Sequence, residues 1–101
     1  IYDAGGKLLI SKGSTAQSGT SAIQTFDITD TLLLPGLYYM AMAMDNTTGT
    51  ISGWASLAAV DMRGSGITQQ ASAFALPDPA TFATFAQTFV PLLSMTPKAT
   101  I

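Results

Sequence analysis

The chain has 101 residues, of which 48% are hydrophobic and only 10% are charged. This length allows one domain with a modest core, and we treat residues 1–101 as a single domain. Six acidic and four basic side chains give a net charge of −2. Nucleic acids and anionic lipids are bound by clustered Lys and Arg, so we expect neither as a partner.

Cysteine and histidine are both absent, which removes disulfides and the commonest acid–base catalyst and metal ligand. We therefore expect no enzymatic activity, no cofactor and no metal site. The longest apolar run, residues 32–44, is interrupted by Pro-Gly and is shorter than the roughly 20 residues of a membrane-spanning helix. Membrane insertion is not expected. Because the chain begins with Ile in the middle of a strand pattern, we expect a fragment of a longer protein.

The first elements in chain order are predicted to be β-strands. Residues 1–3 and 7–10 are short apolar runs on either side of Gly5-Gly6, a pattern typical of a hairpin. Residues 11–22 are rich in Ser, Thr and Gly and form a polar connection. Residues 23–28 alternate between apolar and polar side chains, which predicts a strand.

Residues 32–44 are the segment around which the rest of the chain is organised. Pro35-Gly36 fits the centre of a type II turn, in which Gly36 takes a positive φ. The following eight residues contain no charge, so the predicted strand has two apolar faces. One face carries Leu37, Tyr39, Ala41 and Ala43, and the other carries Tyr38, Met40, Met42 and Met44. We expect both faces to be covered, by the domain interior or by identical chains.

The remaining elements follow a turn at residues 45–50. A strand is predicted from residue 51 to 55, continuing to about residue 62 and pairing with the strand at 37–44. Asp78 as N-cap, Pro79 as first helical residue and Phe82, Phe85 and Phe89 on one stripe predict one short helix near 79–89. A last short strand is predicted at 92–95. Short strands separated by Gly, Pro and Asn turns indicate an all-β fold, an antiparallel β-sandwich or barrel.

Aromatic and methionine side chains are the candidate binding residues. Tyr and Trp rings combine an apolar face with a polar tip, and flexible Met side chains suit irregular contacts between subunits. Two consecutive Tyr residues in a strand point to opposite sides, so one is expected in the core and the other in an interface. The residues that we assign to an interface or ligand surface are Tyr38, Tyr39, Met40, Met42, Met44 and Trp54.

Acidic side chains provide the alternative hypothesis. Two carboxylates held at a suitable separation can hydrolyse a glycosidic bond, and Asp27, Asp30, Asp45 and Asp61 are the candidates. Each is also placed at a strand end or turn, where Asp commonly bonds to its own backbone. The same residues could supply oxygen ligands to calcium, although the spaced acidic loop of a dedicated calcium site is absent.

Two motifs resemble a β-sandwich module of tailed-phage virion proteins, found at the ends of tail fibres, tailspikes and head fibres. They are Ile1-Tyr2-Asp3-Ala4-Gly5-Gly6-Lys7-Leu8-Leu9, and Leu33-Leu34-Pro35-Gly36-Leu37-Tyr38-Tyr39-Met40-Ala41-Met42-Ala43. Residues 75–79 and 90–93 also resemble the proline-rich closing segment of such modules. That family carries further strands before the first motif, so the resemblance implies a jelly-roll-like sandwich that is incomplete at its N-terminus.

The resemblance also implies a function and partners. Such modules commonly form homotrimers, bind other virion proteins, and bind a glycan or protein on the host surface. We therefore expect a non-enzymatic structural and adhesive domain located on the virion. A polysaccharide-degrading tailspike tip that uses the paired Asp residues, and a bacterial carbohydrate-binding surface module, are the alternatives.

Overall fold

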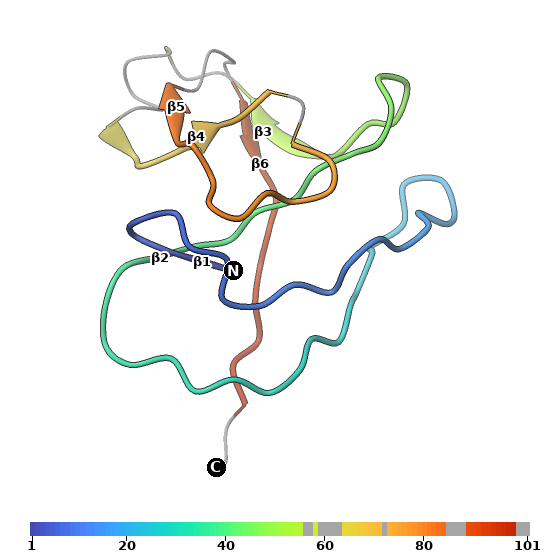
Figure 1. Ribbon diagram of the computed structural model, residues 1–101. Coiled ribbons are helices and arrows are strands. Elements are labelled where there is room, and N and C mark those ends of the chain that lie inside the picture. The colour runs from blue at the N-terminus through green and yellow to red at the C-terminus, as the bar shows by residue number, and fades with distance from the viewer. Residues whose placement is uncertain (56–57, 59–63, 72, 85–88, 99–101) are drawn as a thin grey trace.

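The structure is a computed structural model that describes residues 1–55, 58, 64–71, 73–84 and 89–98, with the backbone alone at Trp54, Ala55 and Phe89. The described residues form short strands joined by long irregular segments (Figure 1). The strands are β1 (Tyr2–Asp3), β2 (Tyr38–Tyr39), β3 (Gly53–Ala55), β4 (Thr68–Gln69), β5 (Ala83–Thr84) and β6 (Phe89–Pro91). They pair antiparallel as β1–β2, β3–β6 and β4–β5. The described chain is all-β in character.

The N-terminal turn forms where the sequence predicts a hairpin. Asp3 Oδ1 accepts hydrogen bonds from the backbone N–H groups of Gly5 and Lys7, both at 2.9 Å. A single antiparallel bridge then joins Tyr2 to Leu8. Gly6 completes the turn with a φ of 92°, a conformation that only glycine adopts at little cost. The predicted turn is therefore confirmed, whereas residues 7–10 form a single bridge and no strand of their own.

The proline-rich segment before β5 packs against this N-terminal turn. The Ala80 N–H donates to the Gly6 carbonyl oxygen at 2.7 Å, and the Leu8 N–H donates to Asp78 Oδ1 at 3.1 Å. Tyr2 donates its hydroxyl proton to the Pro77 carbonyl oxygen at 2.6 Å. Hydrogen bonds between segments about 75 residues apart thus link the beginning of the chain to its last third.

Three aromatic rings, those of Tyr2, Tyr39 and Phe82, form what we call the aromatic cluster. The Phe82 ring meets Tyr2 edge to face with centroids 6.3 Å apart, and it meets Tyr39 at a tilt with centroids 4.6 Å apart. Tyr2 is only 2% exposed, the most buried large side chain among the described residues. Burial raises the pKa of the Tyr2 hydroxyl above its ordinary value, and the negative charge of Asp78 raises it further.

The predicted helix near 79–89 is wrong in its described part. Ala83–Thr84 is strand β5, paired with β4, and Phe89–Pro91 is strand β6, paired with β3. The Asp78 carboxylate accepts a hydrogen bond from Leu8, a tertiary contact that uses the side chain on which the helix N-cap depended. Residues 85–88 lie outside the described part of the chain.

The central segment also differs from its prediction. Only Tyr38–Tyr39 of the predicted strand at 37–44 forms a ladder, because its partner β1 is itself two residues long. The predicted pairing of this segment with residues 51–55 is wrong: β2 pairs with β1, and β3 pairs with β6. Residues 23–28 and 92–95 form no strand, so both of these strand predictions are wrong. Pro35-Gly36 makes a bend in which Gly36 keeps a negative or extended φ, so the type II turn is wrong.

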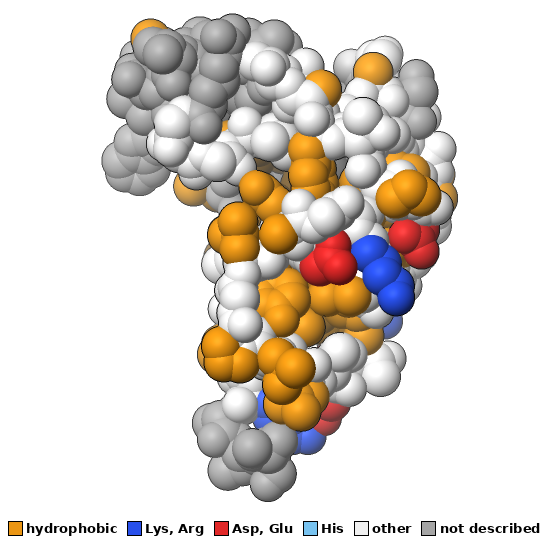
Figure 2. All heavy atoms as spheres, turned by 60° about the vertical axis from the view of Figure 1, so that its left-hand side comes forward, with side chains coloured by type: hydrophobic (Ala, Val, Ile, Leu, Met, Phe, Trp, Pro, Cys, Tyr) orange, Lys and Arg blue, Asp and Glu red, His pale blue; other side chains and the backbone are white. Residues whose placement is uncertain are grey.

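Large apolar side chains remain exposed along the irregular segments. Figure 2 shows hydrophobic side chains gathered on one face, with few charged side chains among them. The exposed large apolar residues of the described chain are Ile23, Phe26, Leu32, Leu34, Leu37, Met40, Met42, Ile51, Phe74, Leu92, Leu93 and Met95. The described residues include no helix with the length and hydropathy needed to cross a membrane.

Candidate functional site

The two tyrosines of β2 have different surroundings, as expected for neighbours in a strand. The Tyr39 ring packs on Phe82 in the aromatic cluster. Tyr38 folds back over the bend at Pro35-Gly36, and its hydroxyl donates to the Leu34 carbonyl oxygen at 2.5 Å. Both side chains are half-buried. Tyr39 is thus the core-facing member of the pair, and Tyr38 secures the bend that leads into β2.

The residues around β2 receive little cover from their own chain. Leu37 is 63% exposed, Met40 46% and Met42 43%. Met44 is half-buried, with its terminal methyl group against the turn at Gly49. The predicted covering of both apolar faces therefore does not come from the single chain. The Trp54 side chain lies outside the described part of the structure, although its backbone pairs with Val90 in the β3–β6 ladder.

A hollow of about 520 Å³ opens beside the methionines. It is lined by residues 42–47 on one side and by Gln70, Ala73 and Phe74 on the other, and we call it the methionine hollow. Asp45 is the one charged residue among the described residues of its lining. The described lining combines Met and Phe side chains with one carboxylate and several amide and hydroxyl groups, so it can offer a small molecule both apolar contact and hydrogen bonds.

The loop at one end of the methionine hollow is held by a single amide side chain. Asn46 Oδ1 accepts hydrogen bonds from the Thr48 N–H at 3.0 Å, the Thr48 hydroxyl at 3.0 Å and the Gly49 N–H at 2.7 Å. Asn46 Nδ2 donates to Asp45 Oδ1 at 2.6 Å. Asn and Asp commonly stabilise turns through such bonds to nearby backbone. The positions of Asp45 and Thr47 are consequently fixed by local structure.

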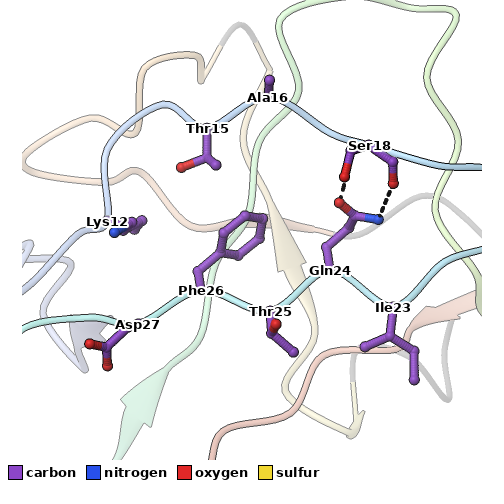
Figure 3. Close-up of a pocket in the computed structure, with 9 residues that line it drawn as sticks. All are labelled: Lys12, Thr15, Ala16, Ser18, Ile23, Gln24, Thr25, Phe26 and Asp27. Carbon is purple, nitrogen blue, oxygen red and sulfur yellow. Dashed lines mark hydrogen bonds between the residues drawn. The ribbon is translucent and has the colours of Figure 1, made fainter.

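A second hollow, of about 370 Å³, lies between the polar connection and the extended segment after it. Gln24 clamps the two segments: its Oε1 accepts from the Ser18 N–H at 3.1 Å, and its Nε2 donates to the Ser18 and Ala22 carbonyl oxygens at 2.8 and 3.0 Å. Figure 3 shows this clamp at one end and Lys12 and Asp27 at the other. The Phe26 ring points into the space between the segments.

The described carboxylates of the alternative hypothesis have separate neighbours. Asp27 lines the second hollow, Asp45 lines the methionine hollow, and Asp30 forms an exposed ion pair with Lys98. Asp61 lies outside the described residues. Within the described part of the chain, no group of three acidic side chains gathers in a way that could hold a metal ion. Neither of these two hollows has two of the candidate carboxylates among its described lining residues.

Two features of this region were not found by sequence reasoning. Gln70 and Phe74 were not among the predicted binding residues, because residues 69–76 carry no periodic pattern that indicates which side chains approach residues 42–47. The Asn46 turn was predicted only as a turn. No protein-family model, curated protein or solved structure matches this chain.

Proposed function

We propose that this chain is a non-enzymatic structural and adhesive module of a tailed-phage virion, belonging to a tail fibre, tailspike or head fibre. The support from the sequence is the pair of motifs at 1–9 and 33–43, together with a charged content of only 10%. The support from the structure is an all-β chain whose small core lies around Tyr2, at the first of those motifs. In this proposal the chain works by binding, without a catalytic step.

The observation that carries the proposal is the exposure of large apolar side chains on and beside the second motif. Leu32, Leu34, Leu37 and Met40 all remain exposed in the single chain. Soluble monomers rarely expose contiguous apolar surface of this kind, whereas subunit interfaces bury it. A chain with so few charges has little else to keep such a surface soluble. Identical chains that cover one another provide the simplest solution.

The proposed assembly is a homotrimer in which each chain completes the fold of its neighbours. The resemblance implies a jelly-roll-like sandwich, and the two-residue strands of a single chain provide too little paired backbone for one. Strands contributed by the neighbouring chains or by preceding residues would extend the β1–β2 ladder. The trimer would attach to other virion proteins at one end and to a glycan or protein of the host surface at the other.

Mass spectrometry of purified virus particles tests the location directly. Peptides of this chain are expected in particles banded on a density gradient, at a copy number that is a multiple of three per particle. Antibody labelling of the same particles is expected at the tail or at head-attached fibres. Peptides found only in the host-cell fraction, and no labelling of particles, would remove the virion proposal.

A further inference from the structure

The methionine hollow presents polar groups whose hydrogen-bonding capacity is not used within the described chain. Asp45 Oδ1 accepts a bond from Asn46, which leaves the second carboxylate oxygen as an acceptor. Gln70 Oε1 accepts from the Thr81 N–H at 2.6 Å, which fixes the amide and leaves its Nε2 as a donor. No described residue bonds the Thr47 hydroxyl. The hollow therefore offers an acceptor, a donor and a group that can be either.

Apolar side chains lie next to these polar groups in the same hollow. Phe74 is 49% exposed and Met42 43% exposed, and both line the hollow. A ligand in this hollow would need an apolar face to pack on Phe74 and Met42. It would also need polar groups at its edge to bond the acceptor and donor groups. An aliphatic ring that carries hydroxyl groups has both properties.

We propose that the methionine hollow binds a neutral saccharide unit. A sugar hydroxyl both donates and accepts, so a set of hydroxyls on one ring can satisfy the Asp45 oxygen, Gln70 Nε2 and the Thr47 hydroxyl together. The C–H face of the ring would pack on Phe74 and Met42. The volume of about 520 Å³ lies within the range of about 300–1,000 Å³ that is usual for small-molecule sites.

A charged ligand satisfies these groups less completely than a neutral sugar does. A lysine or arginine side chain of a protein partner would pair with the Asp45 carboxylate, but it carries donors only, so it would leave Gln70 Nε2 without an acceptor. A uronic acid or other anion would be repelled by the Asp45 carboxylate, which is the one charge among the described residues of the lining, at close range. We therefore expect neutral sugars to bind more tightly than either class. This inference rests on the proposed adhesive function, because it names the ligand of that function.

The methyl signals of the five methionines can show where on the chain a saccharide binds. The probes are methyl glycosides of neutral hexoses, 6-deoxyhexoses and N-acetylhexosamines, each titrated to millimolar concentration into the 101-residue chain with isotope-labelled methionine methyl groups. The Met42 and Met44 methyl signals are expected to shift with at least one probe. Met40 and Met95 lie outside the lining, and their signals are expected to stay in place.

Gln70→Glu is the decisive variant because it keeps an oxygen for the Thr81 N–H and removes the donor. It is expected to weaken saccharide binding about tenfold or more, the usual effect of an unsatisfied polar contact. The matched control is Gln17→Glu, which makes the same charge change in the exposed polar connection and is expected to leave the affinity unchanged. Unchanged amide chemical shifts of Thr48 and Gly49, which bond to Asn46, would establish that the loop of the hollow has kept its structure in Gln70→Glu.

Three results would overturn the inference. The first is no shift of Met42 or Met44 with any neutral probe. The second is saccharide binding that Gln70→Glu leaves intact. The third is tighter binding of methylguanidinium or of a methyl uronate than of every neutral sugar. None of these bears on the subunit number or the location on virus particles, so failure here is distinguishable from failure of the proposed function.

Discussion

The Tyr2 hydroxyl donates a hydrogen bond of 2.6 Å to the carbonyl oxygen of Pro77, which lies 75 residues further along the chain. The bond joins the aromatic cluster to the proline-rich segment, and Tyr2 is 2% exposed. Because few other contacts of the described chain are buried, we expect this small region to contribute much of its stability.

The variant Tyr2→Phe keeps the ring in the aromatic cluster and removes the donor. The Pro77 carbonyl oxygen then lacks its partner in a partly buried position, which costs about 0.5–1.5 kcal/mol. The free energy of unfolding, measured by urea denaturation at a fixed protein concentration, should fall by that amount. The matched control is Tyr38→Phe. The Tyr38 hydroxyl bonds to an exposed carbonyl oxygen, so the free energy of unfolding should fall less in this variant. Equal losses in the two variants would contradict the buried role of Tyr2.

Alkaline pH is expected to destabilise the protein through the same hydroxyl. The folded state raises the pKa of Tyr2, so the unfolded chain loses this proton first, near pH 10. Between that pH and the folded pKa the unfolded state binds fewer protons, and the free energy of unfolding decreases as pH rises. Below about pH 10 the hydroxyl is protonated in both states, so Tyr2 adds nothing to the change of the free energy of unfolding with pH. The decrease should be shallower in Tyr2→Phe, and parallel curves for the two proteins would exclude this account.

Gly6→Ala tests the contact between the N-terminal turn and the proline-rich segment. A Cβ at Gly6 would lie 2.6 Å from the Ala80 carbonyl oxygen, and the residue has a φ of 92°. Gly13→Ala is the matched control, because Gly13 has a φ of 78° with open space around it. Left-handed strain alone costs about 1–2 kcal/mol in each variant. We expect a clearly larger loss for Gly6→Ala in denaturant unfolding, and equal losses would show that the two segments are not in contact.

Phe82→Leu removes both ring contacts of the aromatic cluster while retaining an apolar side chain. Each aromatic pair contributes about 0.5–1.5 kcal/mol beyond its buried area, so a loss of about 1–3 kcal/mol is expected in the free energy of unfolding. Phe26→Leu serves as control, since Phe26 is exposed and has no ring partner among the described residues. A loss from Phe26→Leu as large as that from Phe82→Leu would place the core elsewhere.

The local features of the sequence predicted the turns better than the pairings. The Asp3 to Gly6 turn follows from an Asx side chain and a glycine that takes a positive φ, and both are local signals. The pairing of β3 with β6 joins residues that are far apart in sequence, and the alternation of side chains does not specify a partner. For this reason the predicted pairing of residues 37–44 with 51–55 was wrong.

The helix prediction failed because tertiary contacts used its signals differently. Asp78 was taken as an N-cap and Phe82 as part of a helical stripe, yet Asp78 accepts a bond from Leu8 and Phe82 packs between Tyr2 and Tyr39. Both contacts require the N-terminal turn, which a reading of residues 78–89 alone does not include. Of the residues that line the methionine hollow, Met42 and Met44 were singled out from the sequence, whereas Gln70 and Phe74 depend on the packing of distant segments.

The central claim is that the apolar surface around Leu37 and Met40 is covered by identical chains. Sedimentation velocity of the 101-residue chain, over a wide range of protein concentration, measures the subunit number. We predict a trimer that dissociates when Leu37 and Met40 are both replaced by Ser, whereas replacing the exposed Thr15 and Thr20 by Ser leaves it intact. A stable, folded monomer at every concentration would contradict the claim.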